Sequence, residues 1–220
     1  MGRRTSQVRF TPRVRAGAPG SPVLDRGPVL LAVGVYGALS LVALALAAAA
    51  ERSPVVVRGW LPVEGAVSHA LSAALGLALA LGTVRATRSF VRRFRWARAL
   101  HAGLRPSVRH ASGPTLLVLG LTSAVGEELF FRGLLVPAVG LALSSIGFGL
   151  LHQLRGRERW AWAGWATVMG LLFGGLFVLT GSLVGPIVAH ALINVQNLRF
   201  LRDTEVGAEP PARRLGGVLG

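Results

Sequence analysis

The chain has 220 residues, of which 52% are hydrophobic, and its mean hydropathy is +0.55. This composition excludes an ordinary soluble domain, because the apolar residues stand in long blocks rather than alternating with polar ones. The net charge is +15, but no recognisable nucleic-acid-binding module accompanies it, so we expect no nucleic-acid partner. The chain has no Cys, which excludes disulfides and thiolate metal ligands.

The first 27 residues are rich in Arg, Pro and Gly and show no hydrophobic period, so we expect a disordered basic N-terminal arm. The charge-free block 29–50 is long enough to cross about 30 Å of hydrocarbon as a helix. A loop is predicted over 51–65 and a second span over 66–84. The basic stretch 85–105 has Arg at helical spacing. It fits either an amphipathic helix on an anionic membrane surface or a solvated connector.

Four further apolar blocks follow in the second half and predict four more spanning helices. They cover residues 113–136, 140–153, 161–180 and 183–200. Pro137 and Gly140 separate the first two blocks, and Gly181 with Ser182 predicts a tight hairpin between the last two. The prediction is an all-α polytopic membrane protein of about six transmembrane helices with a buried polar active site. Its parts are a helical domain over 28–200, with a motif-bearing core over about 113–200, and a tail over 201–220.

The distribution of Arg predicts the orientation. Six spans place the arm, residues 85–112, the loop 154–160 and the tail on one side, and these segments, with Arg199 at the end of the last span, hold all but three of the 24 basic residues, every one of them Arg. The positive-inside rule assigns that side to the cytoplasm. We therefore expect a multi-pass protein of the inner or plasma membrane, surrounded by lipid, with both termini cytoplasmic.

Three charged residues stand deep in an apolar block, in the string AVGEELFFRGLL: Glu127, Glu128 and Arg132. A charge at the centre of a span costs about 2.5–3.5 kcal/mol on insertion scales, so it is a functional hypothesis by default. Glu128 and Arg132 are four residues apart and predict an ion pair, for which a structural role fits as well as a chemical one. Glu127 points about 100° away from Glu128 and lacks a local counter-charge, which favours a functional carboxylate.

Two His residues also lie inside predicted spans. His152 ends the fourth block, and His190 lies one helical turn before Asn194. At 1.5 Å per residue, Glu127, His152 and His190 lie about 12 to 17 Å from the same, non-cytoplasmic ends of their helices, so they can share one level in the bilayer. The other His residues lie at or near span ends and are expected to be structural: His69, His101 and His110.

A carboxylate and two imidazoles around a cavity support two kinds of hydrolysis. In one, Glu127 and a His activate water while the other His and Asn194 stabilise the oxyanion. In the other, His152, His190 and Glu127 hold a divalent metal such as zinc. No HExxH or GxSxG motif is present. The competing interpretation is a non-catalytic regulator or transporter with a structural polar core, although the repeated, broken helices of transporters are not seen.

Three motifs follow one another inside the predicted spans. The segment Glu127–Arg132 reads E-E-x-x-x-R, Phe148–His152 reads F-x-x-x-H, and His190–Asn194 reads H-x-x-x-N. Together and in this order they resemble the signatures of the CPBP intramembrane proteases, the family of Rce1-like CAAX prenyl proteases and Abi proteins. The resemblance covers about residues 113–200, and the first two predicted spans match no motif.

The resemblance implies an intramembrane endopeptidase in which Glu127 activates water, assisted by His152, while His190 and Asn194 stabilise the oxyanion. It also implies three supporting residues: Glu128, Arg132 and Phe148. It leaves the cofactor open between none and a metal such as zinc.

The implied substrate is a membrane-anchored protein. It is a prenylated CAAX protein, a bacteriocin leader, or a C-terminal sorting tail of the kind that myxosortase-like bacterial enzymes remove. The chain has no Lys, which is typical of a GC-rich genome and favours a bacterial member.

Overall fold

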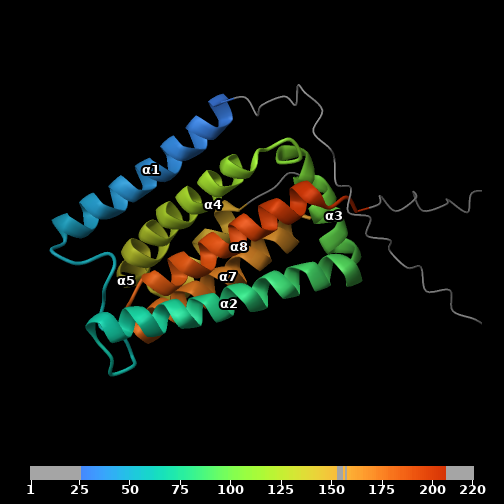
Figure 1. Ribbon diagram of the computed structural model, residues 1–220. Helices are drawn as coiled ribbons and strands as arrows, with labels where there is room; N and C mark the ends of the chain where they lie inside the picture. The colour runs from blue at the N-terminus through green and yellow to red at the C-terminus, as the bar shows by residue number, and fades with distance from the viewer. Residues whose placement is uncertain (1–25, 153–155, 157, 207–220) are drawn as a thin grey trace, which may run out of the picture.

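The computed structural model describes residues 26–152, 156 and 158–206. The predicted arm up to residue 25 and the predicted tail from residue 207 lie outside these residues. The described part is a bundle of helices, and its only extended pairing is a single β-bridge between Val56 and Ser182 (Figure 1). The predicted all-α class is confirmed.

Within the described residues, six helical segments lie where the six spans were predicted. They are α1 (Arg26–Ala49), α2 (Gly65–Arg93), the continuous run of α4 (Gly113–Glu127), η2 (Glu128–Leu135) and α5 (Val136–Val139), then α6 (Leu141–Leu151), α7 (Arg159–Thr180) and α8 (Val184–Asp203). Four segments are long and apolar enough to cross a membrane: Gly27–Ala49, Gly65–Arg93, Gly113–Val139 and Arg159–Thr180. The protein is therefore a polytopic membrane protein.

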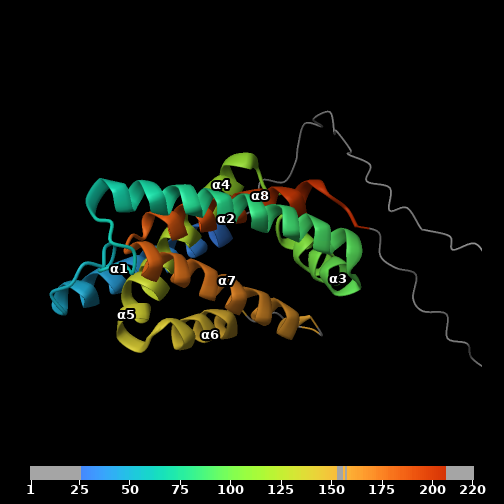
Figure 2. The ribbon, with the colours of Figure 1, turned by 90° about the horizontal axis from the view of Figure 1, so that it is seen from below.

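The two remaining segments differ from a simple span. Helix α6 has 11 residues and is about 16 Å long, so it is shorter than the hydrocarbon core. Figure 2 shows it as a short helix beside α7. Helix α8 has 20 residues, but it carries His190, Asn194 and Asn197 at the spacing of one face. A helix that supplies polar groups to the interior is less apolar than a helix that faces only lipid.

The break after the third span comes at Gly140 and not at Pro137. Pro137 lies in the first turn of α5, where a missing N–H is tolerated. Gly140 has a φ of 87°, a conformation that L side chains rarely adopt, and the chain turns there into α6. The predicted hairpin between α7 and α8 is present, with Gly181 in the left-handed conformation.

The basic stretch 85–105 is divided between two helices. Helix α2 continues to Arg93, the backbone is extended at Phe94, and α3 (Arg95–Leu104) follows, ending in the short η1 (Arg105–Ser107). Helix α3 buries Ala97 in a cluster with Val91 and Val206. Its apolar face therefore packs on the protein itself, which favours the connector over the membrane-surface helix.

Helices α2 and α8 approach closely through small residues. The Ser72 hydroxyl donates to the Ser182 carbonyl at 3.0 Å and accepts from the Gly185 N–H at 3.0 Å. A Cβ at Gly185 would overlap the backbone of Ser72. His69 also bonds Ser182, with 2.7 Å between Nδ1 and Oγ, as fits a structural His. Small residues and hydroxyls of this kind hold helices together where lipid removes the hydrophobic drive.

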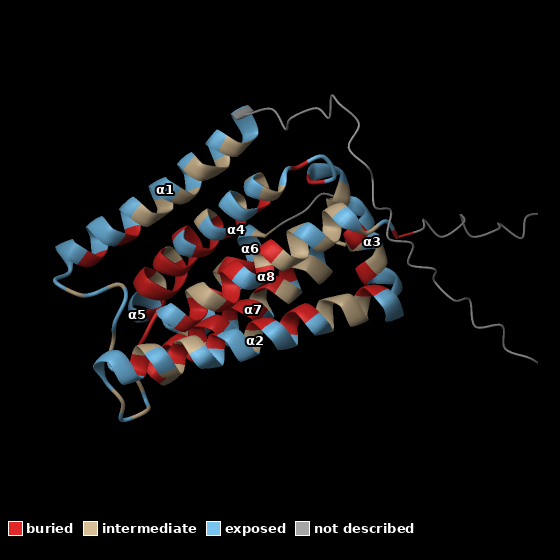
Figure 3. Ribbon diagram, in the orientation of Figure 1, coloured by how far each residue is buried: buried red, intermediate tan, exposed pale blue. Residues whose placement is uncertain are grey.

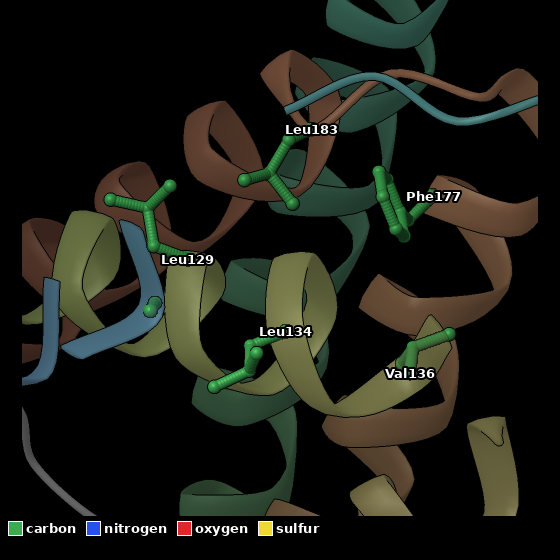
Figure 4. Packing of buried hydrophobic residues seen from close by; sticks show 6 residues of the cluster. Leu129, Leu134, Val136, Phe177 and Leu183 are labelled. Atoms are coloured by element: carbon green, nitrogen blue, oxygen red, sulfur yellow. The ribbon is translucent and has the colours of Figure 1, made fainter. Parts of the chain in front are cut away.

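The buried side chains lie toward the middle of the bundle, whereas α1 and the outer faces of the other helices are mostly exposed (Figure 3). The exposed residues include many large apolar side chains, as a lipid-facing surface requires. Figure 4 shows one buried cluster, in which η2 packs against α7 and the start of α8. Its labelled members are Leu129, Leu134, Val136, Phe177 and Leu183. This cluster supports the helix segment next to the candidate site.

Candidate active site

Glu127 is the last residue of α4 and precedes the π-helix η2. Its side chain is buried, with 7% of the residue surface exposed, and its Oε2 atom has no hydrogen-bond partner among the described residues. Helical segments of π type occur frequently at functional sites. An acceptor atom that is buried without a donor is a site where water or a substrate group can bind.

Two imidazoles face this atom. The Nε2 atom of His152 lies 3.8 Å from Glu127 Oε2, and the Nε2 atom of His190 lies 3.7 Å from it. His152 is the C-cap residue of α6, and His190 lies in the middle of α8. The structure thus brings together the three groups that the sequence placed at one level. Both gaps exceed direct hydrogen-bond length, and a water between the groups can bridge them.

Neighbouring acceptors orient both rings. His152 Nδ1 lies 2.7 Å from the Phe148 carbonyl oxygen, and His190 Nδ1 lies 2.7 Å from Glu128 Oε1. Because a carbonyl or carboxylate oxygen accepts, we assign the Nδ1 proton to both rings, which turns Nε2 toward Glu127. The anchors differ in charge. The Glu128 carboxylate stabilises a positive charge on His190, whereas a neutral carbonyl gives His152 less support for one.

Glu128 and Arg132 form the predicted pair, with 3.0 Å between Oε1 and Nη1, and both are almost wholly buried. The Arg132 guanidinium lies 4.3 Å from the ring centroid of Phe148 and 5.3 Å from that of Phe173. Aromatic faces attract a cation and compensate for its loss of water. Glu128 therefore bridges Arg132 and His190. The sequence did not predict the second contact.

Phe148 has two contacts at the site besides its carbonyl bond. Its ring lies 4.3 Å from the His152 ring, between centroids, and it is also one of the faces of the Arg132 cage. The ring of Phe173 stacks on His190, with centroids 5.0 Å apart and 21° between the planes. The aromatic rings therefore restrict both imidazoles to one orientation.

Asn194 lines the same cavity, and in the described part of the chain its side chain bonds Ser123 and not His190. Its Nδ2 donates to the Ser123 hydroxyl at 3.0 Å, which leaves the second Nδ2 proton free to point elsewhere. Ser123 was not predicted as a site residue. Its position could have indicated it, because Ser123 precedes Glu127 by one helical turn and so lies on the same face of α4.

These side chains line a cavity of about 360 Å³ that also extends toward Leu104 and Leu201, near the α3 end of the bundle. The wall is mostly apolar, with Trp162 and Trp165 among its aromatic members. Tyr36 of α1 also lines this cavity. Tyr36 was not predicted as a site residue, since a single Tyr in a charge-free span belongs to no motif. A mostly apolar cavity with a few convergent polar groups is the usual form of a binding site.

The zinc alternative would need Glu127, His152 and His190 as ligands, a donor set of the kind that binds zinc. Within the part of the chain that the structure describes, no group of three or more acidic or His side chains is arranged to hold a metal ion.

Comparisons with known proteins point to the same segment. Residues 110–196 match the family model of the type II CAAX prenyl endopeptidase Rce1-like proteins. An uncharacterized protein of Bacillus subtilis (strain 168), YpbD, is 35% identical over 81 residues, which are 37% of this chain and 42% of that protein. The alignment thus spans less than half of the relative's length. No solved structure matches the chain.

Proposed function

We propose that the chain is a member of the Rce1-like family, whose model matches residues 110–196, and that it is an intramembrane endopeptidase that cleaves membrane-anchored proteins. One observation carries the proposal. The partnerless Oε2 of Glu127 faces two Nε2 atoms, 3.7 and 3.8 Å away, on the wall of a cavity between apolar helices. The arrangement suits a water that is activated by a base and attacks a carbonyl.

In the proposed reaction, a water lies between Glu127 and His152. Glu127, assisted by His152, takes a proton from the water, and the water oxygen forms a bond to the carbonyl carbon of the substrate. The carbonyl oxygen becomes an oxyanion. The protonated Glu127 then gives its proton to the amide nitrogen as the carbon–nitrogen bond breaks, leaving an acid and an amine.

The oxyanion needs donors on the opposite side of the carbonyl. His190 supplies Nε2–H when it is charged, a form that Glu128 stabilises from Nδ1 at 2.7 Å. Asn194 supplies the Nδ2 proton that is not bonded to Ser123. Arg132 in turn holds Glu128, which makes the pair a support for His190 and not only a structural ion pair.

The substrate reaches the cavity from the membrane in this proposal, because the helices around the cavity present large apolar side chains outward. A prenylated CAAX protein, a bacteriocin leader and a C-terminal sorting tail all meet this requirement.

We also propose that both termini are cytoplasmic. The start of α1, helix α3 and the end of α8 lie at one end of the bundle (Figure 1). Reporters fused at Gly59 and at the C-terminus should give opposite signals, and equal signals would contradict this orientation.

The test is cleavage of a single-span substrate by purified Glu127→Gln protein, expressed per folded molecule. The amide keeps the shape but cannot take the proton, so turnover should fall by at least about a hundredfold. Folding should survive, because the change removes a buried charge. His152→Ala should be comparably inactive, and the double variant little worse, because residues that act as a unit are not additive.

Glu51→Gln is the matched control, since Glu51 is exposed in the loop after α1. It should cleave like the wild type. Near-equal rates for Glu127→Gln and wild type would overturn the mechanism and leave a structural polar core. A parallel reaction with a chelator separates the two chemistries, because loss of cleavage on chelation would assign the water to a metal.

A further inference from the structure

We infer that Tyr36 of α1 is a positioning residue of this site, and that its hydroxyl holds the Glu127 carboxylate toward the two imidazoles. The inference rests on the proposed role of Glu127. It adds a residue from outside the three motifs, and from a helix outside the segment 110–196 that matches the family model.

Tyr36 and Glu127 lie on the wall of the same cavity, and the charge of the Glu127 carboxylate acts on the phenol. We assign the hydroxyl as a donor to this carboxylate, because an ionised carboxylate only accepts. Both imidazoles lie too far from Oε2 for a direct hydrogen bond. In this inference, Tyr36 holds the carboxylate when no water or substrate is bound.

The backbone fixes Tyr36 at this place. A Cβ at Gly126 would lie 2.6 Å from the Tyr36 carbonyl oxygen and 3.0 Å from the Tyr36 Cβ. Since Gly126 immediately precedes Glu127, the contact sets the distance from the phenol to the carboxylate. The Ser40 hydroxyl also donates to the Tyr36 carbonyl at 2.9 Å, within α1.

Within the described part of α1, Tyr36 accepts a hydrogen bond from Ser40 through its backbone carbonyl, and its hydroxyl has no partner within the helix. The helix packs on α4 and η2, and its outward residues, such as Leu30, Leu31 and Leu41, are 67–70% exposed. Tyr36 is the only Tyr in the chain. A Tyr hydroxyl that is buried among apolar groups usually finds a hydrogen-bond partner, and here that partner is the proposed base.

The hydroxyl should affect the rate more than substrate binding. The hydroxyl holds the carboxylate in place for proton transfer, and a misplaced catalytic group slows the reaction. The other charged or titratable groups near Glu127 are Glu128 and Arg132 on η2, His152 at the end of α6 and His190 on α8. Tyr36→Phe keeps the ring and removes only the donor.

The first measurement is the steady-state cleavage rate of Tyr36→Phe over a range of pH. We expect kcat to fall by roughly 10- to 100-fold, as a misplaced catalytic group does, while KM changes little. Thr122→Val is the matched control, because it removes a hydroxyl that bonds the Val118 carbonyl within α4 and does not line the cavity, and it should keep the wild-type profile. A packing role alone would lower the folded amount and leave kcat per folded molecule and its pH profile unchanged, which would overturn the inference.

The second measurement needs no cleavage, so it separates this inference from the proposed function. Protein labelled with ¹³C at the ring Cζ of Tyr gives one resonance, since the chain has one Tyr. We expect Glu127→Gln to shift this resonance and Glu51→Gln to leave it in place. An unchanged resonance in Glu127→Gln would overturn the contact. If Glu127→Gln shifts the resonance but the wild-type protein cleaves no substrate, the contact stands and the proposed protease function is overturned.

Discussion

The cavity wall formed by α4, α6, α7 and α8 is held by polar contacts with η2 behind it, whereas the wall formed by α1 is held by close packing. Behind the first wall, Glu128 is 0% and Arg132 1% exposed, and the two are joined to each other and to His190. On the second, only Ala43 and Ala47 are buried among the described residues of α1. The first wall supplies the proposed chemistry, and the second supplies one hydroxyl.

This difference predicts two kinds of sensitivity. A buried polar network in a low dielectric loses much free energy when one member is removed, because the remaining charges lose their partners. A helix held by small-residue packing loses less when a contact is disturbed, since each atom pair contributes little. Changes in the network should therefore unfold the protein, whereas changes at α1 should leave it folded with an altered site.

Arg132→Ala should have the largest effect on stability. The change leaves Glu128 buried with His190 as its remaining partner and empties the cage of Phe148 and Phe173. Breaking a buried pair costs about 3 to 5 kcal/mol. We expect a lower midpoint of thermal unfolding in detergent and a smaller folded yield.

Arg58→Ala is the control for this change, because Arg58 is exposed in the loop between α1 and α2. It should unfold like the wild type. A well-folded but inactive Arg132→Ala protein would contradict the supporting role and assign the guanidinium to the reaction itself.

Gly126→Ala tests the contact between the two walls. The added Cβ meets the Tyr36 carbonyl oxygen at 2.6 Å, so α1 must move. Overpacking of this kind costs about 1 to 3 kcal/mol. We expect a modest loss of stability together with a larger loss of cleavage rate per folded molecule, because Tyr36 moves away from Glu127.

The control for that variant is Gly37→Ala on α1, where a Cβ meets nothing within 4 Å. Ala is the better helix former, so this change should be neutral or slightly stabilising. If the two variants were equal in stability and rate, the packing of α1 on α4 would have no influence on the site.

The sequence predicted the ion pair that lies within one helix. Glu128 and Arg132 are four residues apart, and helical geometry brings such residues together. The depth argument also placed Glu127 level with both imidazoles. Depth says nothing about rotation, however. The contacts of His190 with Glu128 and of Asn194 with Ser123 depend on how α8 is turned toward α4, so they could not be predicted.

Helix ends were predicted less well, because hydropathy and helix formation are different properties. The apolar block ends at Val84, yet α2 continues to Arg93, since Arg is a good helix former and no Pro intervenes. Conversely, the apolar block 140–153 predicted a full span, whereas α6 has 11 residues. The role of α1 at the site was not predictable, since Tyr36 belongs to no pattern.

The smallest expected effect concerns His101 of α3, a buried polar residue that lies outside the proposed site. His101 is buried in α3, where Nε2 donates to the Thr204 carbonyl at 2.9 Å and the ring packs on Phe200. Burial lowers the pKa of His101 below its ordinary value. The Thr204 contact opposes this shift, and the Arg105 charge adds to it. The unfolded chain therefore binds this proton more readily than the folded protein does.

The sign of the pH effect follows from this pKa. Because the folded pKa is depressed, the stability contributed by His101 is present above the ordinary value of 6.5 and is lost as the pH falls below it. His101→Gln keeps a donor for Thr204 but does not titrate, so it isolates this residue from the other His residues. Between pH 7.5 and 5.5, the unfolding midpoint of the wild type should fall further than that of His101→Gln. Equal pH dependence in wild type and His101→Gln would show that the α3 corner does not respond to this proton.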